Sequence, residues 1–265
     1  MDTKDMAIYA ENVKKKVRLG VLDGRAFRED VSSKFSKGKT QDSSQYLMAV
    51  DGVSFVIKKG ERVGLIGRNG AGKSTLLKMI CRITEPTEGF IGVNGRVTSM
   101  LEIGVGFHSE LTGKDNIYLS GSILGMSKSE IDERLDEIIA FSGLEEFMDT
   151  PVKRYSTGMY LRLAFAVSAH LRADIVILDE VLAVGDLEFQ KKCIATMKEI
   201  ALEEQRTVLY VSHNMETVKE LCNRCLVMDK GKIVFDGPVE ESIAVYKKLM
   251  AIDSDSLEGV ENAQG

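Results

Sequence analysis

The sequence is poor in the residues that mark several classes of protein. Its 265 residues include only three prolines and four cysteines, while hydrophobic residues make up 44% and charged residues 28%. That balance excludes a collagen-like, proline-rich or wholly disordered chain. The 40 acidic and 35 basic residues nearly cancel, giving a formal net charge of -5, so we expect no general electrostatic attraction to nucleic acid.

Long apolar runs are also missing. The most apolar region, residues 161–184, is interrupted by Arg162, Arg172 and Asp174. No stretch reaches the ~20 consecutive apolar residues that a helix needs to span a bilayer. The first residues, Met1–Met6, lack the apolar segment of a secretion signal. We therefore expect a cytoplasmic chain that would reach a membrane only through a partner.

Only two of the cysteines, Cys222 and Cys225, lie close together in the sequence. Such a pair could be a redox motif or half of a zinc site, but a zinc site needs four ligands and no second pair is present. Cys222 ends a helical pattern, and Cys225 begins an apolar run. We predict that both are buried apolar residues.

Strands alternate with helices along most of the chain, which predicts an α/β fold with a largely parallel sheet. Two runs, 175–178 and 208–211, are fully apolar, as strands are when both faces of a sheet are covered. The runs 48–57 and 61–66, joined by Lys58–Gly60, look like a hairpin. Further strands are predicted at 6–13, 90–100, 226–228 and 233–235, and helices at 76–82, 127–141, 157–171, 187–202, 215–222 and 238–250.

Two segments do not fit this alternation. Residues 20–46 combine glycines, serines and scattered charges with little periodicity, which predicts a long surface loop or insertion. The end of the chain, 251–265, is acidic and has few apolar residues, so we predict a disordered tail.

The segment Gly67–Ser74 matches the phosphate-binding pattern G-x-x-x-x-G-K-[ST], and it follows an apolar strand and begins a helix. In such a loop, backbone N–H groups and the positive end of the helix dipole surround phosphate oxygens. Lys73 supplies a positive charge for the β- and γ-phosphates, and the Ser74 hydroxyl can bind Mg²⁺. The pattern predicts binding of a nucleoside triphosphate. The candidate residues are Gly67, Asn69, Gly70, Gly72, Lys73, Ser74 and Thr75.

The apolar strand 175–178 ends in two acids, Asp179 and Glu180. Ligands of open α/β sheets bind at the carboxyl ends of parallel strands. Asp179 is therefore a candidate for holding Mg²⁺, directly or through water. Glu180 is a candidate for aligning the attacking water, because a carboxylate of ordinary pKa is a weak base.

Three further motifs resemble those of ATP-binding cassette (ABC) proteins. Residues 155–159, Tyr-Ser-Thr-Gly-Met, resemble the signature motif LSGGQ, although Thr157 and Met159 depart from it. The segment 181–186 resembles the D-loop, and 210–214 resembles the strand end that carries the switch histidine, here His213. Together with 101–113, these motifs resemble most the ATP-binding subunits of bacterial exporters for lipid-linked polysaccharides, such as O-antigen, capsule and teichoic acid.

The resemblance implies a P-loop NTPase fold over residues 1–250, with a RecA-like, mostly parallel sheet, a small antiparallel β subdomain and a helical subdomain at about 108–170. It also implies an ATPase that uses Mg²⁺ and forms a head-to-tail dimer with a second copy. In that dimer Ser156, Gly158 and Asp186 would contact the ATP of the partner copy, while Glu180 and His213 would act in catalysis. The implied partner is an integral membrane permease at the cytoplasmic face of the bacterial inner membrane, with polysaccharide contacted only indirectly and no nucleic acid.

Two positions depart from the family. The Q-loop glutamine is not found before residues 111–112, and the nearest candidate for its contact with the metal is Glu102. The aromatic residue that stacks on adenine would fall near Val17, which has no π-face. Phe27 or Phe35, within 20–46, could take its place. We expect the remaining histidines, His108 and His170, to be structural or on the surface.

The region from Glu102 to Thr150 is where the resemblance implies docking of the permease. It contains apolar residues that could line a groove for an incoming helix, although some must belong to the core. These residues are Ile103, Val105, Phe107, Leu111, Ile117 and Leu124.

Two other functions were weighed. A soluble ABC ATPase acting on DNA or ribosomes would carry long coiled coils or a second cassette, and neither is found in the sequence. The basic run 14–18 is weak support for nucleic-acid binding, because charge runs usually form a solvated face. A small-molecule kinase would leave the signature motif unexplained.

Overall fold

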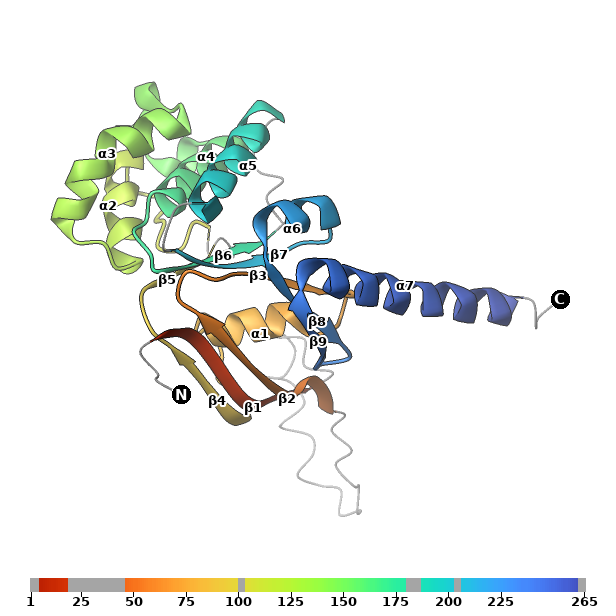
Figure 1. Ribbon diagram of the computed structural model, residues 1–265. Helices are drawn as coiled ribbons and strands as arrows, with labels where there is room; N and C mark the ends of the chain where they lie inside the picture. The colour runs from red at the N-terminus through yellow and green to blue at the C-terminus, as the bar shows by residue number, and fades with distance from the viewer. Residues whose placement is uncertain (1–4, 19–45, 100–102, 180–186, 203–205, 262–265) are drawn as a thin grey trace, which may run out of the picture.

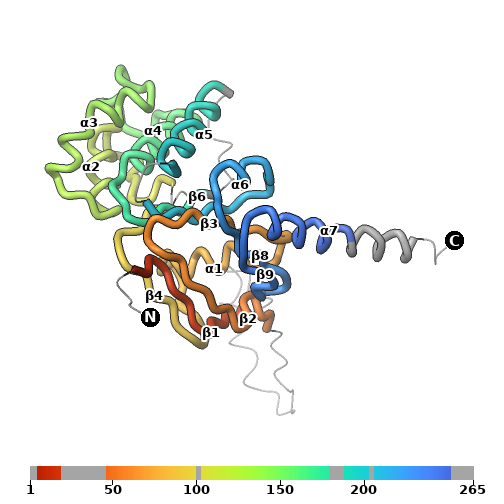
Figure 2. The backbone as a smooth tube through the Cα atoms, in the orientation of Figure 1, coloured from red at the N-terminus to blue at the C-terminus, as the bar shows by residue number. Residues whose placement is uncertain are grey.

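The computed structural model describes residues 5–18, 46–99, 103–179, 187–202 and 206–261 (Figures 1 and 2). These residues form two sheets and a group of helices. The strands are β1 (Met6–Arg18), β2 (Tyr46–Lys58), β3 (Arg62–Gly67), β4 (Glu88–Val93), β5 (Val97–Ser99), β6 (Ile175–Asp179), β7 (Thr207–Val211), β8 (Arg224–Asp229) and β9 (Lys232–Pro238). The α-helices are α1 (Lys73–Ile80), α2 (Gly113–Ile123), α3 (Lys128–Ser142), α4 (Thr157–Ala169), α5 (Leu187–Leu202), α6 (Met215–Leu221) and α7 (Val239–Glu261).

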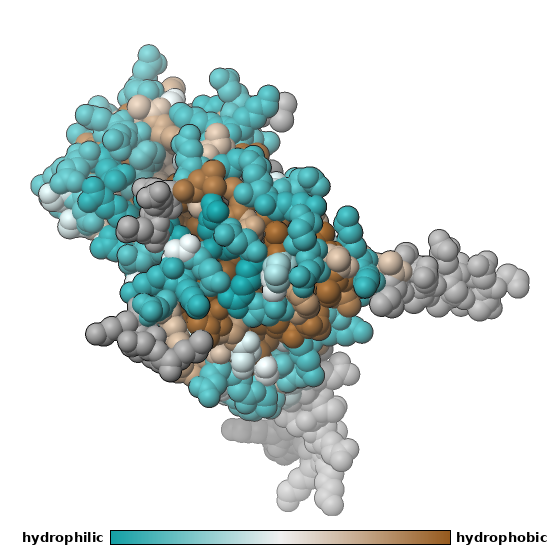
Figure 3. Space-filling view, viewed as in Figure 1, coloured by the Kyte–Doolittle hydropathy of each residue, from teal (hydrophilic) through white to brown (hydrophobic). Residues whose placement is uncertain are grey.

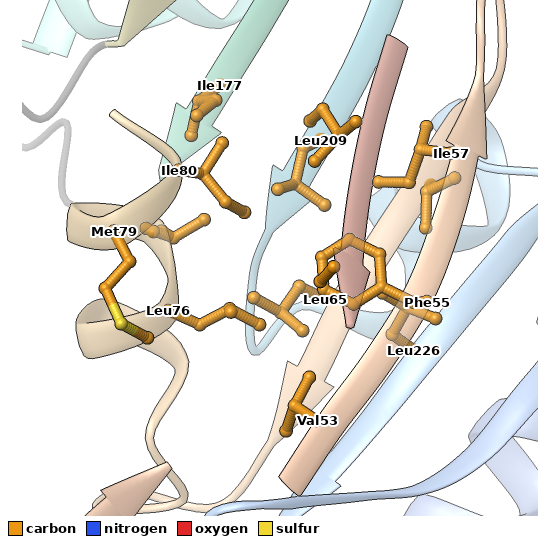
Figure 4. Packing of buried hydrophobic residues seen from close by; sticks show 14 of the residues in the cluster. Val53, Phe55, Ile57, Leu65, Leu76, Met79, Ile80, Ile177, Leu209 and Leu226 are labelled. Atoms are coloured by element: carbon orange, nitrogen blue, oxygen red, sulfur yellow. The ribbon is translucent and has the colours of Figure 1, made fainter. Parts of the chain in front are cut away.

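The larger sheet has six strands in the order β5-β6-β7-β3-β8-β9, parallel except for β9. Because successive side chains of a strand point to opposite faces of the sheet, each buried strand contributes apolar side chains to the core on both faces. Leu65, Ile177 and Leu209 point toward α1 and the smaller sheet (Figure 4). On the other face, Val176 and Tyr210 pack against α5, α6 and α7. The predicted α/β class with a mostly parallel sheet is confirmed.

The smaller sheet is antiparallel and has the order β2-β1-β4. It lies beside α1 (Figure 1), and Val53, Phe55 and Ile57 of β2 share one buried cluster with Leu65 of β3. The predicted hairpin of 48–57 and 61–66 is therefore wrong. These strands belong to different sheets because their apolar faces meet across a common core, so they do not pair edge to edge.

Helices α2, α3 and α4 form a separate group around Ile117, Ile131, Ile138 and Leu163 (Figure 1). Helix α3 starts with a capping box, in which Ser127 and Glu130 each bond the other's backbone N–H. Helix α2 is not among the helices predicted above. This group corresponds to the helical subdomain that the resemblance implies.

The two unusual segments have different outcomes. Residues 19–45, nearly all of the predicted insertion, lie outside the described part of the chain, but Arg18 pairs with Tyr46, so the insertion joins two adjacent strand ends. Helix α7 continues to Glu261, so much of the tail predicted to be disordered has a helical backbone. Residues 239–258 contain no proline or glycine to stop a helix, which explains the difference. Hydrophobic side chains gather at the base of α7, near β8 and β9 (Figure 3).

Candidate nucleotide site

The phosphate-binding loop connects β3, which ends at Gly67, to α1, which begins at Lys73. Gly72 caps the helix with a φ of 101°, in the left-handed region. A Cβ atom there would overlap the carbonyl oxygen of Ala49, so only glycine fits. The first N–H groups of α1 have no partners within the helix, which makes this end an anion site.

Lys73 lies across the loop that it follows. Only 7% of the residue is exposed. Its Nζ atom donates to the carbonyl oxygens of Gly67 at 2.5 Å and Arg68 at 2.9 Å. The ammonium group is thus held beside the helix terminus, where the phosphates of a nucleotide would be attracted by both.

A cleft of about 770 Å³ opens over the loop, within the size range of small-molecule sites. The end of β7 also reaches it, because Ser212 and the exposed His213 line the cleft. The structure thus brings His213 together with all the predicted loop residues except Gly67, whose carbonyl holds Lys73. The full lining is Val17, Leu47, Met48, Ala49, Arg68, Asn69, Gly70, Ala71, Gly72, Lys73, Ser74, Thr75, Val211, Ser212, His213 and Lys230.

Asp179 ends β6 at the same edge of the sheet. Its backbone pairs with Val211 of β7, and Val211 pairs with Leu65 of β3. The backbone of Asp179 is therefore two strands away from the strand that carries the loop, at the carboxyl edge where ligands bind. Glu102, Glu180 and Asp186 lie outside the described residues, as do Phe27 and Phe35.

The signature-like residues lie at the start of α4, in the helical group. Ser156 is the N-cap, and its hydroxyl accepts a hydrogen bond from the N–H of Met159 at 3.2 Å. Ser156 and Thr157 are exposed, and a Cβ atom on Gly158 would meet only the Ser156 hydroxyl, at 3.9 Å. This helix end is open, and its residues are absent from the described lining of the cleft.

Nine lining residues were not among the predicted site residues, and three of them show how the tertiary fold completes the cleft. Val17 and Leu47 pair across the β1–β2 ladder and are 40% and 53% exposed. Lys230 begins the β8–β9 turn, where the N–H of Gly231 donates to the carbonyl of Ala71 at 3.0 Å. At the position where an aromatic residue was expected to stack on adenine, the edge of the cleft therefore carries the aliphatic pair Val17 and Leu47. Only the tertiary fold brings these residues to the loop. The family resemblance pointed to Val17 as the position next to adenine, whereas the local sequence gives no signal for Leu47 and Lys230.

The remaining cysteine and histidine predictions can be compared with the structure. Cys222 and Cys225 are buried and unpaired, as predicted, and burial raises their pKa values to about 12 and 11. His170 is half-buried with Nδ1 2.7 Å from the carbonyl of Ala166, and burial lowers its pKa. His108 is exposed. In the described part of the chain, no helix has both the length and the apolar character to cross a membrane.

Comparison with known proteins identifies the family. The family model described as "ABC transporter" matches residues 50–183. The O-antigen export system ATP-binding protein RfbB of Klebsiella pneumoniae is 47% identical over 204 residues, which is 77% of this chain and 82% of the relative. RfbB of Myxococcus xanthus is 42% identical over 93% of this chain, which spans 56% of that protein. The teichoic acids export ATP-binding protein TagH of Lactococcus lactis subsp. lactis is 38% identical over 94% of this chain and 52% of its own length.

A solved structure shares the fold. The dimeric structure of the ATP-binding cassette MJ0796 bound to ADP and Pi has a TM-score of 0.65 with this chain, at 20% identity. The match covers 88% of this chain and 98% of that one. The solved structure shows the shared fold, and the family model and the relatives show that the chain belongs to the ABC transporter family, as an ATP-binding and ATP-hydrolysing member of it.

Proposed function

We propose that this chain is the ATP-hydrolysing subunit of a membrane exporter for lipid-linked polysaccharide of the O-antigen, capsule or teichoic acid type. The observation that carries the proposal is the 47% identity to an O-antigen export ATP-binding protein over 82% of that protein. The alternative, an ATPase acting on nucleic acid or ribosomes, has no comparable support. The chain would lie at the cytoplasmic face of the bacterial plasma membrane, attached through a permease.

The loop residues would bind the triphosphate. The N–H groups at the start of α1 face the cleft, with Asn69, Gly70 and Thr75 among its lining. Lys73 would exchange its two carbonyl partners for β- and γ-phosphate oxygens, which are stronger acceptors because they are charged. The apolar side chains of Val17 and Leu47 would pack against the base.

Residues at the cleft and at the neighbouring sheet edge supply the oxygen ligands that Mg²⁺ prefers. Ser74 is exposed at the first turn of α1, in the cleft, and Asp179 ends β6 at the same edge of the sheet. These two oxygens would hold the ion together with ATP phosphates, and Glu102 would be a further contact. When bound, Mg²⁺ neutralises charge on the phosphate oxygens. Glu180 would align the attacking water, and His213 would bond the γ-phosphate.

The signature-like residues would act in a dimer. Ser156 and Gly158 begin an exposed helix and are not part of the cleft lining of their own chain. In a head-to-tail pair they would contact the γ-phosphate held by the partner copy, with the α4 dipole adding to the attraction. Asp186 would also contribute to this interface. Loss of the γ-phosphate would remove that contact and release the dimer.

The permease would dock on the 104–112 loop and the neighbouring end of α2. Val105, Leu111 and Ile123 expose 39%, 36% and 55% of their surface here, and a Cβ atom on Gly106 would touch Ile123. The loop runs along α2, from Gly106 beside Ile123 at the helix end to Leu111 at the helix start. Scattered apolar exposure is common, but exposed apolar residues along one such stretch suit an apolar helix. Ile117, one of the predicted groove residues, is fully buried between α2, α3 and α4, so it belongs to the core.

Deletion of the gene, followed by complementation, tests the proposal. We expect loss of surface polysaccharide, restored by the wild-type chain, and co-purification of the chain with an integral membrane protein in detergent. Unchanged surface polysaccharide in the deletion strain would contradict the proposed export role. Recovery of nucleic acid or ribosomes in place of a membrane protein would favour the alternative.

A further inference from the structure

The buried face of α2 carries two polar side chains one helical turn apart, Asn116 and Ser120. They are 0% and 2% exposed. Buried polar groups cost stability unless they are hydrogen-bonded, so their partners indicate what they hold. All the partners that the structure gives these two side chains belong to the 104–112 loop, which precedes α2.

Asn116 bonds the second half of that loop. Its Oδ1 atom accepts from the N–H of His108 at 2.6 Å. Its Nδ2 atom lies 3.1 Å from the carbonyl oxygens of both His108 and Leu111, and 2.8 Å from that of Thr112. An amide supplies one acceptor and two donor hydrogens, and here all of them are used on backbone groups within one short segment.

Ser120 bonds the first half of the loop. Its hydroxyl donates to the carbonyl oxygen of Val105 at 2.7 Å. The opposite side of the loop contacts α4, the helix that Ser156 begins. The Tyr160 hydroxyl lies 3.4 Å from the carbonyl oxygen of Gly104. The rings of Tyr160 and Phe107 pack edge to face, with their centroids 5.2 Å apart. The loop is thus fixed between α2 and the first turns of α4.

We infer that Asn116 and Ser120 are positioning residues that hold the 104–112 loop in the shape that receives the permease and passes its contact to α4. The inference rests on the proposed function, because it assigns the loop to the permease. Neither residue lies in the nucleotide cleft, so neither acts on ATP directly. Their removal affects coupling and leaves ATP binding intact.

The first test uses the full chain alone. The variants are Asn116→Ala and Ser120→Ala, with Ser142→Ala as a matched control. Ser142 is also a buried helical serine, and it also donates to a carbonyl at 2.7 Å, but that carbonyl is Ile139 within its own helix. Hydrogen exchange should accelerate at the amides of 104–112 in the two α2 variants and not in the control. ATP affinity should stay unchanged in all three.

The second test uses the chain reconstituted with its membrane subunit in proteoliposomes. In the α2 variants, we expect the permease-stimulated kcat to fall roughly tenfold, within the usual range of coupling between sites. The KM for ATP and the basal turnover should not change, whereas a general folding defect would lower the basal turnover together with the stimulated one. Ser142→Ala should behave as wild type.

The outcomes separate the two claims. Unchanged exchange in the 104–112 amides would overturn the assignment of Asn116 and Ser120, whatever the permease does. Faster exchange with full stimulation would overturn their role in coupling. A wild-type chain that no permease stimulates would instead contradict the proposed function. If Asn116→Ala does not fold, the milder Ser120→Ala decides the question.

Discussion

At the scale of single residues, Lys73 is the residue of the cleft whose charge should matter most for ATP binding. It is a buried cation that the phosphate-binding loop holds beside the start of α1. Lys73→Ala should weaken ATP binding by about 1.5–3 kcal/mol, the usual worth of a hydrogen bond to a charged group. Titration calorimetry measures this. Lys78→Ala is the control, since Lys78 is exposed in the last turn of the same helix. Equal ATP affinity in Lys73→Ala and wild type would contradict the role of Lys73.

Thr98 on β5 presents the opposite case, a buried hydroxyl that no described residue hydrogen-bonds. It is 6% exposed, and its buried hydroxyl has no hydrogen-bond partner in the described residues. Thr98→Val keeps the shape and removes the unpaired hydroxyl, so the free energy of unfolding should rise by about 1 kcal/mol. Urea unfolding measures the change.

Thr207 supplies the matched control for that substitution. It is 1% exposed on β7, but its hydroxyl accepts from the N–H of Gly60 at 3.1 Å. Thr207→Val should therefore lower the free energy of unfolding, because it leaves that N–H without its partner. A Thr98→Val chain that is less stable than wild type would show that the Thr98 hydroxyl has a partner.

At the scale of elements, the pairing of β1 with β2 predicts what happens when the predicted insertion is removed. Arg18 and Tyr46 already pair, so a short turn can replace residues 19–45 without moving either strand. We expect the shortened chain to fold, with altered coupling to transport. ATP affinity is also informative, because Val17 and Leu47 line the cleft next to the removed segment. Circular dichroism, calorimetry and export assays measure these effects. A chain that fails to fold would show that the segment belongs to the core.

Sequence patterns predicted elements well where the apolar spacing was regular. Helix α3, predicted at 127–141 from its apolar spacing, occupies Lys128–Ser142, and the structure adds a capping box of Ser127 and Glu130 at its start. Helix α2 was missed because its buried face includes Asn116 and Ser120, polar residues that hide the apolar period. Thr112, whose hydroxyl accepts from the N–H of Asp115, was the available signal for its start.

The residues of the cleft also fall into a group that the sequence predicted and a group that it did not. Its loop was predictable because the glycines, the lysine and the serine perform their function within one short segment. Val17, Leu47 and Lys230 come from distant strands and reach the loop only through sheet pairing and the β8–β9 turn. The hairpin error has the same origin, because the sequence shows which residues are apolar and not which sheet they face.

At the scale of the whole molecule, the site is completed only when two copies meet, if Ser156 and Gly158 act as proposed. Glu180→Gln keeps the shape of the side chain and removes its charge, so it should retain ATP binding and lose hydrolysis. An ATP-bound dimer should therefore accumulate, as measured by light scattering with ATP. The same variant without ATP is the control and should be monomeric. Undiminished turnover in Glu180→Gln would remove Glu180 from its role.

The proposed contact with the permease can be tested by placing a charge on the exposed loop. Leu111 is the better position, since it is 36% exposed, whereas Phe107 is half-buried and packs on Tyr160. Leu111→Glu should uncouple ATP turnover from polymer export because a helix docking there would have to desolvate the carboxylate. Phe107→Glu should do the same but also disturb the contact with α4. ATP binding should persist in both, because neither residue is part of the cleft.

The control for that charge is Ile83→Glu. Ile83 follows α1, is 52% exposed and lies outside the helical group, so it presents a comparable apolar surface away from the loop. Export of surface polysaccharide is measured in cells, and ATP turnover is measured with the purified complex. The expected pattern is lost export with retained ATP binding for Leu111→Glu and normal export for Ile83→Glu. Normal export in both loop variants would place the docking surface elsewhere on the molecule, because a buried carboxylate in a helix groove cannot be neutral in its effect.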